Sequence, residues 1–191
     1  MHALFVTTSS DQLAPGHPTG LWLEEFAVPY IAVTEAGITV TVASPKGGAV
    51  PLDPKTEPNE TQRKNWAVAI QALCHSVTLD SVKEEHFDAI FIPGGHGPMV
   101  DLANDTTLHA LVARHDAAGK LIAAVCHGPA ALVNARRRIR RRVISARWLL
   151  EPPMTHPWRS RPVAVNYPRW NPGAESGSPG FVGRSYINIS P

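Results

Sequence analysis

The stretch Leu121-Ile122-Ala123-Ala124-Val125-Cys126-His127-Gly128-Pro129 decides the fold of this 191-residue chain. Five apolar residues in a row predict a buried strand, and the change to Cys-His-Gly-Pro predicts a sharp turn into a helix that begins near Ala130. A strand that runs directly into a reactive side chain and then into a helix is a nucleophile elbow, here with Cys in place of Ser.

The same alternation of strands and helices extends upstream of this stretch. Apolar or β-prone runs predict strands at residues 4–7, 39–43 and 89–92. Helices are predicted over residues 20–36 (capped by Thr19 and kinked at Pro29), 66–74 and 106–118, with a loop over 44–59. We therefore expect an α/β fold whose mostly parallel sheet is covered on both faces, with ligands at the carboxyl ends of the strands.

Cys126 is the strongest candidate for a catalytic residue. A helix N-terminus behind it would lower the pKa of its thiol and favour the nucleophilic thiolate. His127, next to it, is placed to orient the thiolate or to move protons near neutral pH. The alternatives are a small buried core cysteine and a histidine that makes only a local hydrogen bond.

Two further motifs accompany this pair. Gly94-Gly95-His96-Gly97 follows an apolar strand, and glycines there allow backbone N–H groups to approach a ligand as an oxyanion hole; a turn that merely needs positive φ is the alternative. Glu24 and Glu25 interrupt an apolar helical stretch. A glutamate that faces the interior near a thiolate would be protonated and could donate to it, whereas one on a solvated helix face would have no such role.

The cysteine content and the lack of long apolar runs argue against a disulfide-rich, metal-binding or membrane-spanning protein. Two cysteines, Cys74 and Cys126, are too few for a disulfide framework and suit a reducing cytoplasm. We expect Cys74 to be in the core or partly buried, and no metal site, because no second Cys or His pair has ligand spacing. No apolar run is long enough for a membrane span, and the N-terminus has no signal-peptide pattern.

Residues 134–191 differ in composition from the rest. Residues 1–133 are acidic overall, whereas 134–191 hold many arginines, no lysine and only two acidic residues, Glu151 and Glu175. The arginine run at 136–142 lacks interleaved aromatic residues, so we expect a solvated segment there and no nucleic-acid partner. We divide the chain into an α/β domain at 1–134 and an Arg/Pro-rich tail at 135–191.

Four stretches in order resemble the ThiJ/PfpI superfamily, whose members are similar to type 1 glutamine amidotransferases: residues 19–25, 43–48, 91–97 and 123–130. The segment around 51–54 is most similar to the heat-shock chaperone and glyoxalase III branch. The resemblance covers residues 1–133 and implies a flavodoxin-like three-layer sandwich, often dimeric. The tail departs from the family pattern, so our hypothesis is a diverged or frameshifted terminus that leaves the sheet atypical or incomplete.

The resemblance also implies roles for individual residues. It places the nucleophile on Cys126, its partner on His127, the buried glutamate on Glu25, and an oxyanion hole on the backbone of Gly95 and His127. The implied activity is a glutathione-independent glyoxalase, a lyase of the D-lactate dehydratase class that converts methylglyoxal to lactate, or related aldehyde and deglycase chemistry, without metal or cofactor. A stress chaperone, a cysteine redox sensor and an inactive truncated relative are the competing interpretations.

Overall fold

A five-stranded sheet organises residues 1–135, the part of the chain that the computed structural model describes. Its strands are β1 (His2–Val6), β4 (Thr39–Ser44), β5 (Val77–Thr78), β6 (Ala89–Ile92) and β7 (Leu121–Ala124). They lie in the order β5-β4-β1-β6-β7, and every neighbouring pair is parallel. The predicted α/β class with a mostly parallel sheet is confirmed.

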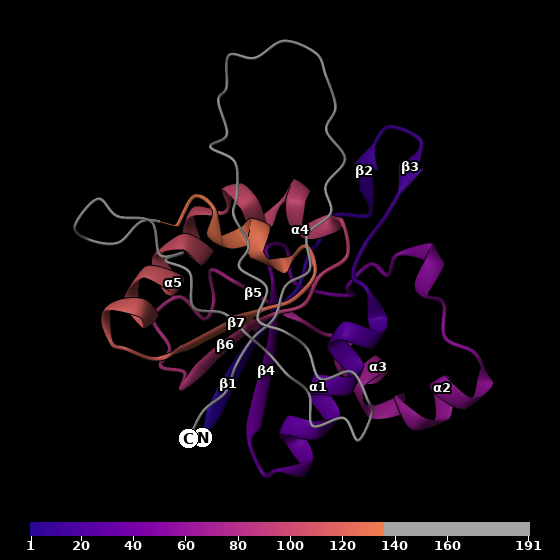
Figure 1. The fold of residues 1–191 in the computed structure, drawn as a ribbon, viewed down its shortest axis with the longest axis horizontal. Coiled ribbons are helices and arrows are strands. Elements are labelled where there is room, and N and C mark those ends of the chain that lie inside the picture. Colours follow the sequence, from indigo (N-terminus) through magenta and orange to yellow (C-terminus); the bar gives the residue numbers. More distant parts are fainter. Residues whose placement is uncertain (136–191) are drawn as a thin grey trace, which may run out of the picture. The chain divides into compact units, whose positions relative to one another are not determined.

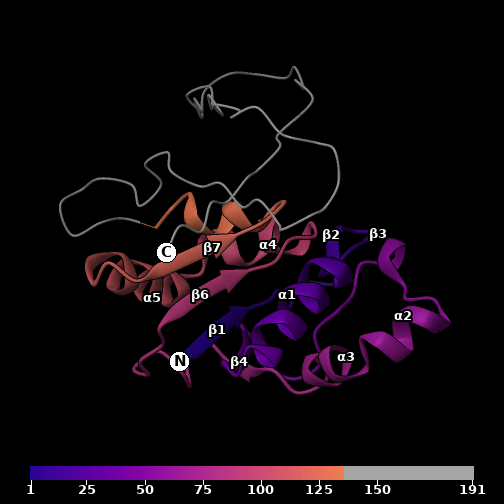
Figure 2. The ribbon, with the colours of Figure 1, turned by 60° about the horizontal axis from the view of Figure 1, so that its bottom comes forward.

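Helices cover both faces of this sheet (Figures 1 and 2). The main helices are α1 (Leu23–Glu35) and α3 (Ala67–Leu73) on one side and α5 (Thr106–Ala117) on the other. The chain moves outward from β1 to β4 through α1 and in the opposite direction from β6 to β7 through α5. Right-handed crossovers therefore put the two helices on opposite faces, which gives the expected three layers. The order reverses between β1 and β6, the point where ligands bind in such sheets.

Shorter elements complete the domain. They are the hairpin strands β2 (Gln12–Ala14) and β3 (His17–Pro18), the helices α2 (Glu60–Asn65) and α4 (Gly97–Val100), and the 3-10 turns η1 (Pro54–Thr56), η2 (Leu102–Asn104) and η3 (Gly128–Leu132). The sequence did not predict the hairpin, α2 or β5. These elements are short, and their residues carry little periodicity; only Asn59 and Gln62, which form a capping box at α2, gave a local signal.

An aromatic cluster fixes α1 against the sheet. Phe5 of β1 and Phe91 of β6 are register partners whose ring centroids lie 4.8 Å apart. Phe26 of α1 meets Phe5 edge-on at 5.8 Å and stacks on Tyr30 at 5.2 Å. Since Phe26 follows Glu25 directly, the packing that buries this ring also holds the glutamate beside the carboxyl ends of the strands.

The start of α1 was predicted wrongly. The helix begins at Leu23 rather than Gly20, and its N-cap, Trp22, makes no side-chain capping bond. Thr19 does not cap the helix because its hydroxyl donates to Asp53 Oδ2 at 3.1 Å. Leu21 is held in a parallel bridge with Leu52, so a tertiary contact keeps this segment extended. The helix continues through Pro29 to Glu35.

Two further expectations need correction. The segment after Cys126 is the short 3-10 turn η3 rather than the start of an α-helix. Cys74 lies at the C-cap of α3 and is exposed, not in the core. The predicted tail lies outside the described residues from residue 136 onward, and its arginine run lies there entirely. The predicted domain boundary between residues 134 and 135 stays a prediction. In the described part of the chain, no helix has the length and apolar character needed to cross a bilayer.

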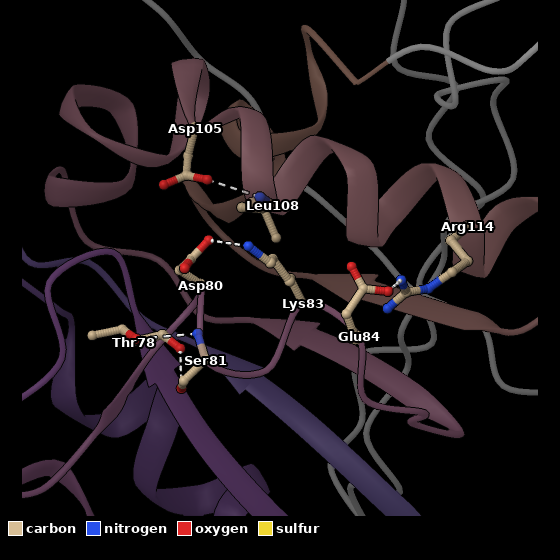
Figure 3. A network of polar contacts seen from close by, with 8 residues as sticks. All are labelled: Thr78, Asp80, Ser81, Lys83, Glu84, Asp105, Leu108 and Arg114. Carbon is tan, nitrogen blue, oxygen red and sulfur yellow. Dashed lines mark hydrogen bonds and ion pairs between the residues drawn. The ribbon is translucent and has the colours of Figure 1, made fainter.

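Side-chain contacts at the surface define where α5 begins and connect it to the loop before β6 (Figure 3). Asp105 is the N-cap of α5 and accepts a hydrogen bond from the N–H of Leu108 at 2.8 Å. Arg114, near the other end of α5, pairs with Glu84 at 3.8 Å. The cap provides an acceptor for an N–H group that has no partner within the helix. It therefore contributes more to the stability of the fold than the exposed ion pair does.

We expect Asp105→Ala to lower the free energy of unfolding by about 1 kcal/mol, because it leaves this N–H without its acceptor. Asp11→Ala, at an exposed position outside the helices, is the matched control and should change stability little. Urea unfolding followed by circular dichroism measures both. Equal stability of the two variants would contradict the capping role.

Candidate active site

Cys126 occupies a strained turn at the carboxyl end of β7. Its φ angle is 52°, and it is the one non-glycine residue with positive φ in the described part of the chain. The turn is held by backbone hydrogen bonds from Val125 N–H to the Ile92 carbonyl at 3.1 Å and from Gly128 N–H to the Val125 carbonyl at 2.7 Å. A side chain held in the left-handed region at the end of a parallel strand is typical of a functional position. Cys126 is accessible to solvent on one side and packed against the protein on the other, so the alternative of a buried core cysteine is wrong.

The loop after β6 lies directly against this turn. A Cβ atom at Gly94 would come within 2.6 Å of both the Cβ of Cys126 and Oε2 of Glu25. Gly95 has a φ angle of 91°, and a Cβ there would collide with the Gly20 carbonyl oxygen and the Trp22 nitrogen. Glycine at both positions therefore lets two loops and the start of α1 meet, with no side chain between the thiol and the carboxyl group.

Backbone N–H groups face the sulfur. Those of Gly95 and His127 act on Cys126 Sγ as hydrogen-bond donors, and both lower the pKa of the thiol. Two N–H groups that converge on one atom can also stabilise an oxyanion on a carbon bound to that atom. The two positions predicted for an oxyanion hole are thus brought together around Cys126.

Glu25, and not Glu24, faces the site. Glu25 is half-buried, and its Oε2 accepts a hydrogen bond from the Gly94 N–H at 3.0 Å, whereas Glu24 is exposed. Burial raises the pKa of the Glu25 carboxyl group, although hydrogen bonds from Cys126 and Gly94 oppose the rise. The solvated helix face predicted as an alternative applies to Glu24 alone.

The pKa of the Cys126 thiol is raised, which contradicts the prediction that a helix N-terminus lowers it. Partial burial is the main cause, and the neighbouring Glu25 carboxylate adds to it through its charge. The turn η3 that follows is too short to supply a helix field, so only the two N–H groups favour the thiolate. Glu25 and Cys126 are therefore electrostatically coupled, because the charge of the carboxylate disfavours the charge of the thiolate.

His127 completes the contacts of the sulfur. Its Nδ1 lies 3.1 Å from Cys126 Sγ, within hydrogen-bond distance for a sulfur atom. Burial lowers the pKa of His127, and the nearby His96 adds to the effect. A neutral imidazole at this place can accept a proton at physiological pH.

The structure adds two residues for which sequence reasoning proposed no role. The ring of His96 lies 4.6 Å from the ring of His127, and its Nδ1 is 3.8 Å from Oδ2 of buried Asp53. Both residues stand inside motifs that carried the family resemblance, but they are far apart in sequence, and only the fold brings them together. In residues 1–135, no three His, Cys, Asp or Glu side chains are grouped so that they could hold a metal ion.

The sequence profile of the DJ-1/PfpI family matches residues 19–156, which is more than half of the chain. The chain belongs to the DJ-1/PfpI family. A crystal structure of the Francisella tularensis Rapid Encystment Protein 24 KDa is 32% identical, with a TM-score of 0.69 over 77% of this chain and 67% of that one. The Candida albicans glyoxalase III structure, at 20% identity and a TM-score of 0.60 over 73% of this chain and 62% of that one, shares the fold.

Curated family members carry names of enzymes. A glutathione-independent glyoxalase of Schizosaccharomyces pombe is 31% identical over 61% of this chain and 51% of its own length. A deglycase of Pyrococcus horikoshii is 29% identical over 58% of this chain and 57% of its own length. The chain thus spans about half the length of the curated relatives it matches.

We expect Glu25→Gln to lower the pKa of the Cys126 thiol, because the variant removes a negative charge that opposes formation of the thiolate. Alkylation by iodoacetamide at pH 7, which needs only the thiolate, should therefore become faster. Glu24→Gln is the matched control, since it removes a charge from the same helical turn at an exposed position. Thiolate absorbance at 240 nm against pH gives the pKa directly, and a higher pKa in Glu25→Gln would contradict the coupling described above.

Proposed function

We propose that this protein is a glutathione-independent glyoxalase that converts methylglyoxal to lactate through Cys126. The observation that carries the proposal is the position of Sγ, on a strained turn between the Glu25 carboxyl group and two backbone N–H donors. The names of the curated relatives support this class of reaction.

The first step forms a bond between sulfur and the aldehyde carbon. Glu25 takes the thiol proton as Sγ attacks C1 of methylglyoxal, so the raised pKa of the carboxyl group suits it to this transfer. The C1 oxygen becomes an oxyanion, which the N–H groups of Gly95 and His127 stabilise. Glu25 then returns its proton to this oxygen, and a neutral hemithioacetal results.

The second step moves hydrogen between neighbouring carbons. His127 is neutral because its pKa is lowered, so it can accept the proton from C1 and then deliver it to C2 through an enediolate. Over the same step, the proton of the C1 hydroxyl passes to the C2 oxygen. The product is a thioester of lactate on Cys126, and water hydrolyses it to lactate and the free thiol. C1 is oxidised while C2 is reduced by the same two electrons, so the reaction requires no redox cofactor.

The same nucleophile serves the related chemistry predicted for this site. Other small reactive aldehydes, and the sugar-derived adducts on which a deglycase acts, offer a carbonyl carbon to the same sulfur. The contacts of this site are made to that carbonyl group rather than to the rest of the substrate. They come from Cys126, Glu25 and the two N–H groups. Lyase activity of the D-lactate dehydratase class is the most specific form of the proposal.

A cytoplasmic setting, a role in the stress response and a homodimeric assembly belong to the same proposal. Both cysteines are free, as suits a reducing compartment in which a thiol nucleophile must stay reduced. Light scattering of the purified protein at micromolar concentration tests the assembly, with a mass of twice 20.7 kDa expected.

We expect wild-type protein to form lactate from methylglyoxal with glutathione absent, and Cys126→Ala to reduce this activity to the level of buffer, because the bond-forming atom is lost. Cys74→Ala is the matched control. Cys74 is the other cysteine of the chain, and it is exposed at the C-terminal end of α3. Chromatographic detection of lactate gives the rate. A wild-type protein that folds cooperatively but forms no lactate would contradict the proposal. If Cys126→Ala then still suppresses the aggregation of other proteins, a chaperone function would be favoured instead.

A further inference from the structure

The buried aspartate Asp53 lies close to His96, and the ring of His96 lies beside the ring of His127. Asp53 Oδ2 lies 3.8 Å from Nδ1 of His96, too long for a hydrogen bond but within the range of an ion pair. The His96 ring in turn lies 4.6 Å from the His127 ring at an angle of 45°. The proposed mechanism uses neither Asp53 nor His96.

Asp53 is held firmly in its place. Its side chain is 4% exposed, and Oδ1 accepts the Lys55 N–H at 3.0 Å while Oδ2 accepts the Thr19 hydroxyl at 3.1 Å. A carboxylate that is buried and anchored in this way keeps its orientation toward the next cationic or donor group. Among the described residues, His96 is the basic side chain with a nitrogen within 4.0 Å of this carboxylate, and the contact is an ion pair when the imidazole is protonated.

The backbone fixes His96 as well. Its neighbour Gly95 packs against the Gly20 carbonyl and the Trp22 nitrogen, so the loop cannot shift without breaking this contact. With Nδ1 directed toward Asp53, Nε2 stands at the other side of the ring, and 37% of the side chain remains exposed. An imidazole whose Nδ1–H faces a carboxylate presents Nε2 as an acceptor when the ring is neutral and as a proton donor when the ring is protonated.

We propose that His96, oriented by Asp53, is a second acid of the site and protonates the oxygen on the carbon next to the one that Cys126 attacks. The inference rests on the proposed function, because an α-oxoaldehyde carries two adjacent carbonyl groups. The N–H groups of Gly95 and His127 serve the first oxygen, and the second needs a donor of its own. His96 follows Gly95 directly and faces His127, so it flanks the position where that second oxygen would lie.

The proton transfers balance over the step. His127 takes the proton from C1 as His96 gives one to the C2 oxygen, which turns the hemithioacetal into an enediol. His127 then gives its proton to C2, and the C1 hydroxyl returns a proton to His96 as the thioester carbonyl forms. In this sequence His96 carries its additional proton before the first transfer and again after the second, and the Asp53 carboxylate faces its Nδ1 throughout.

The test separates turnover from the reactivity of the thiol. His96→Asn is expected to lower kcat for lactate formation by about 100-fold or more, the contribution of a positioned acid, while the rate of Cys126 alkylation by iodoacetamide stays near that of wild type. His86→Asn is the matched control at an exposed position before the amino end of β6, opposite the end that leads into the site, and it should match wild type in both assays. Added imidazole should partly restore turnover in His96→Ala, and Asp53→Asn should lower kcat in the same direction, with thermal melting as the check on folding.

Each result decides a separate point. Unchanged kcat in His96→Asn, with wild type active, would overturn the assignment of His96 and leave the proposed function intact. An equal fall in alkylation and turnover, without imidazole rescue, would show that His96 only holds the geometry of Cys126 and would also overturn it. If neither wild type nor His86→Asn forms lactate, the proposed function is contradicted. The acid role of His96 is then contradicted as well.

Discussion

The close approach of the loop after β6 to the turn after β7 is the constraint on which the site depends. Gly94 lies between Cys126 and Glu25, and Gly95 packs against the chain just before α1, so a side chain at either position would force the loops apart. This single contact brings a carboxyl group and two N–H groups to the sulfur of Cys126. The aromatic packing of Phe5, Phe26 and Phe91 keeps α1 in the position that the contact requires.

Burial and a neighbouring charge, rather than a helix field, govern the thiol. The pKa of Cys126 is raised by partial burial and by Glu25, while the N–H groups of Gly95 and His127 oppose the rise. A thiol of this kind is less reactive on its own than one at a helix N-terminus, because less of it is thiolate at neutral pH. In the proposed mechanism its reactivity depends on transfer of the proton to Glu25 at the moment of attack, which would confine the chemistry to a substrate held beside both groups.

Local patterns predicted the elements whose residues bury a continuous apolar surface. The predicted strand at 89–92 and the predicted helix at 106–118 agree with β6 and α5. In each of them the buried apolar residues, such as Ile90 and Leu111, recur at the spacing expected for that element. The start of α1 was missed because Thr19 bonds to Asp53, a contact that no local window contains. Cys126, Glu25 and Gly95 could be found from motifs, whereas the pairing of His96 with Asp53 exists only once the fold joins distant segments. The raised pKa of Cys126 likewise depends on a neighbour from another element.

The central claim is that Sγ of Cys126 forms a bond to a carbonyl carbon whose oxygen lies between the N–H groups of Gly95 and His127. A crystal structure of the full chain, soaked with methylglyoxal and frozen before turnover, tests it most directly. We expect continuous density from Sγ to C1, with the C1 oxygen within hydrogen-bond distance of both nitrogens. An unmodified Cys126 beside a modified Cys74, or an adduct whose oxygen points away from Gly95, would contradict the account.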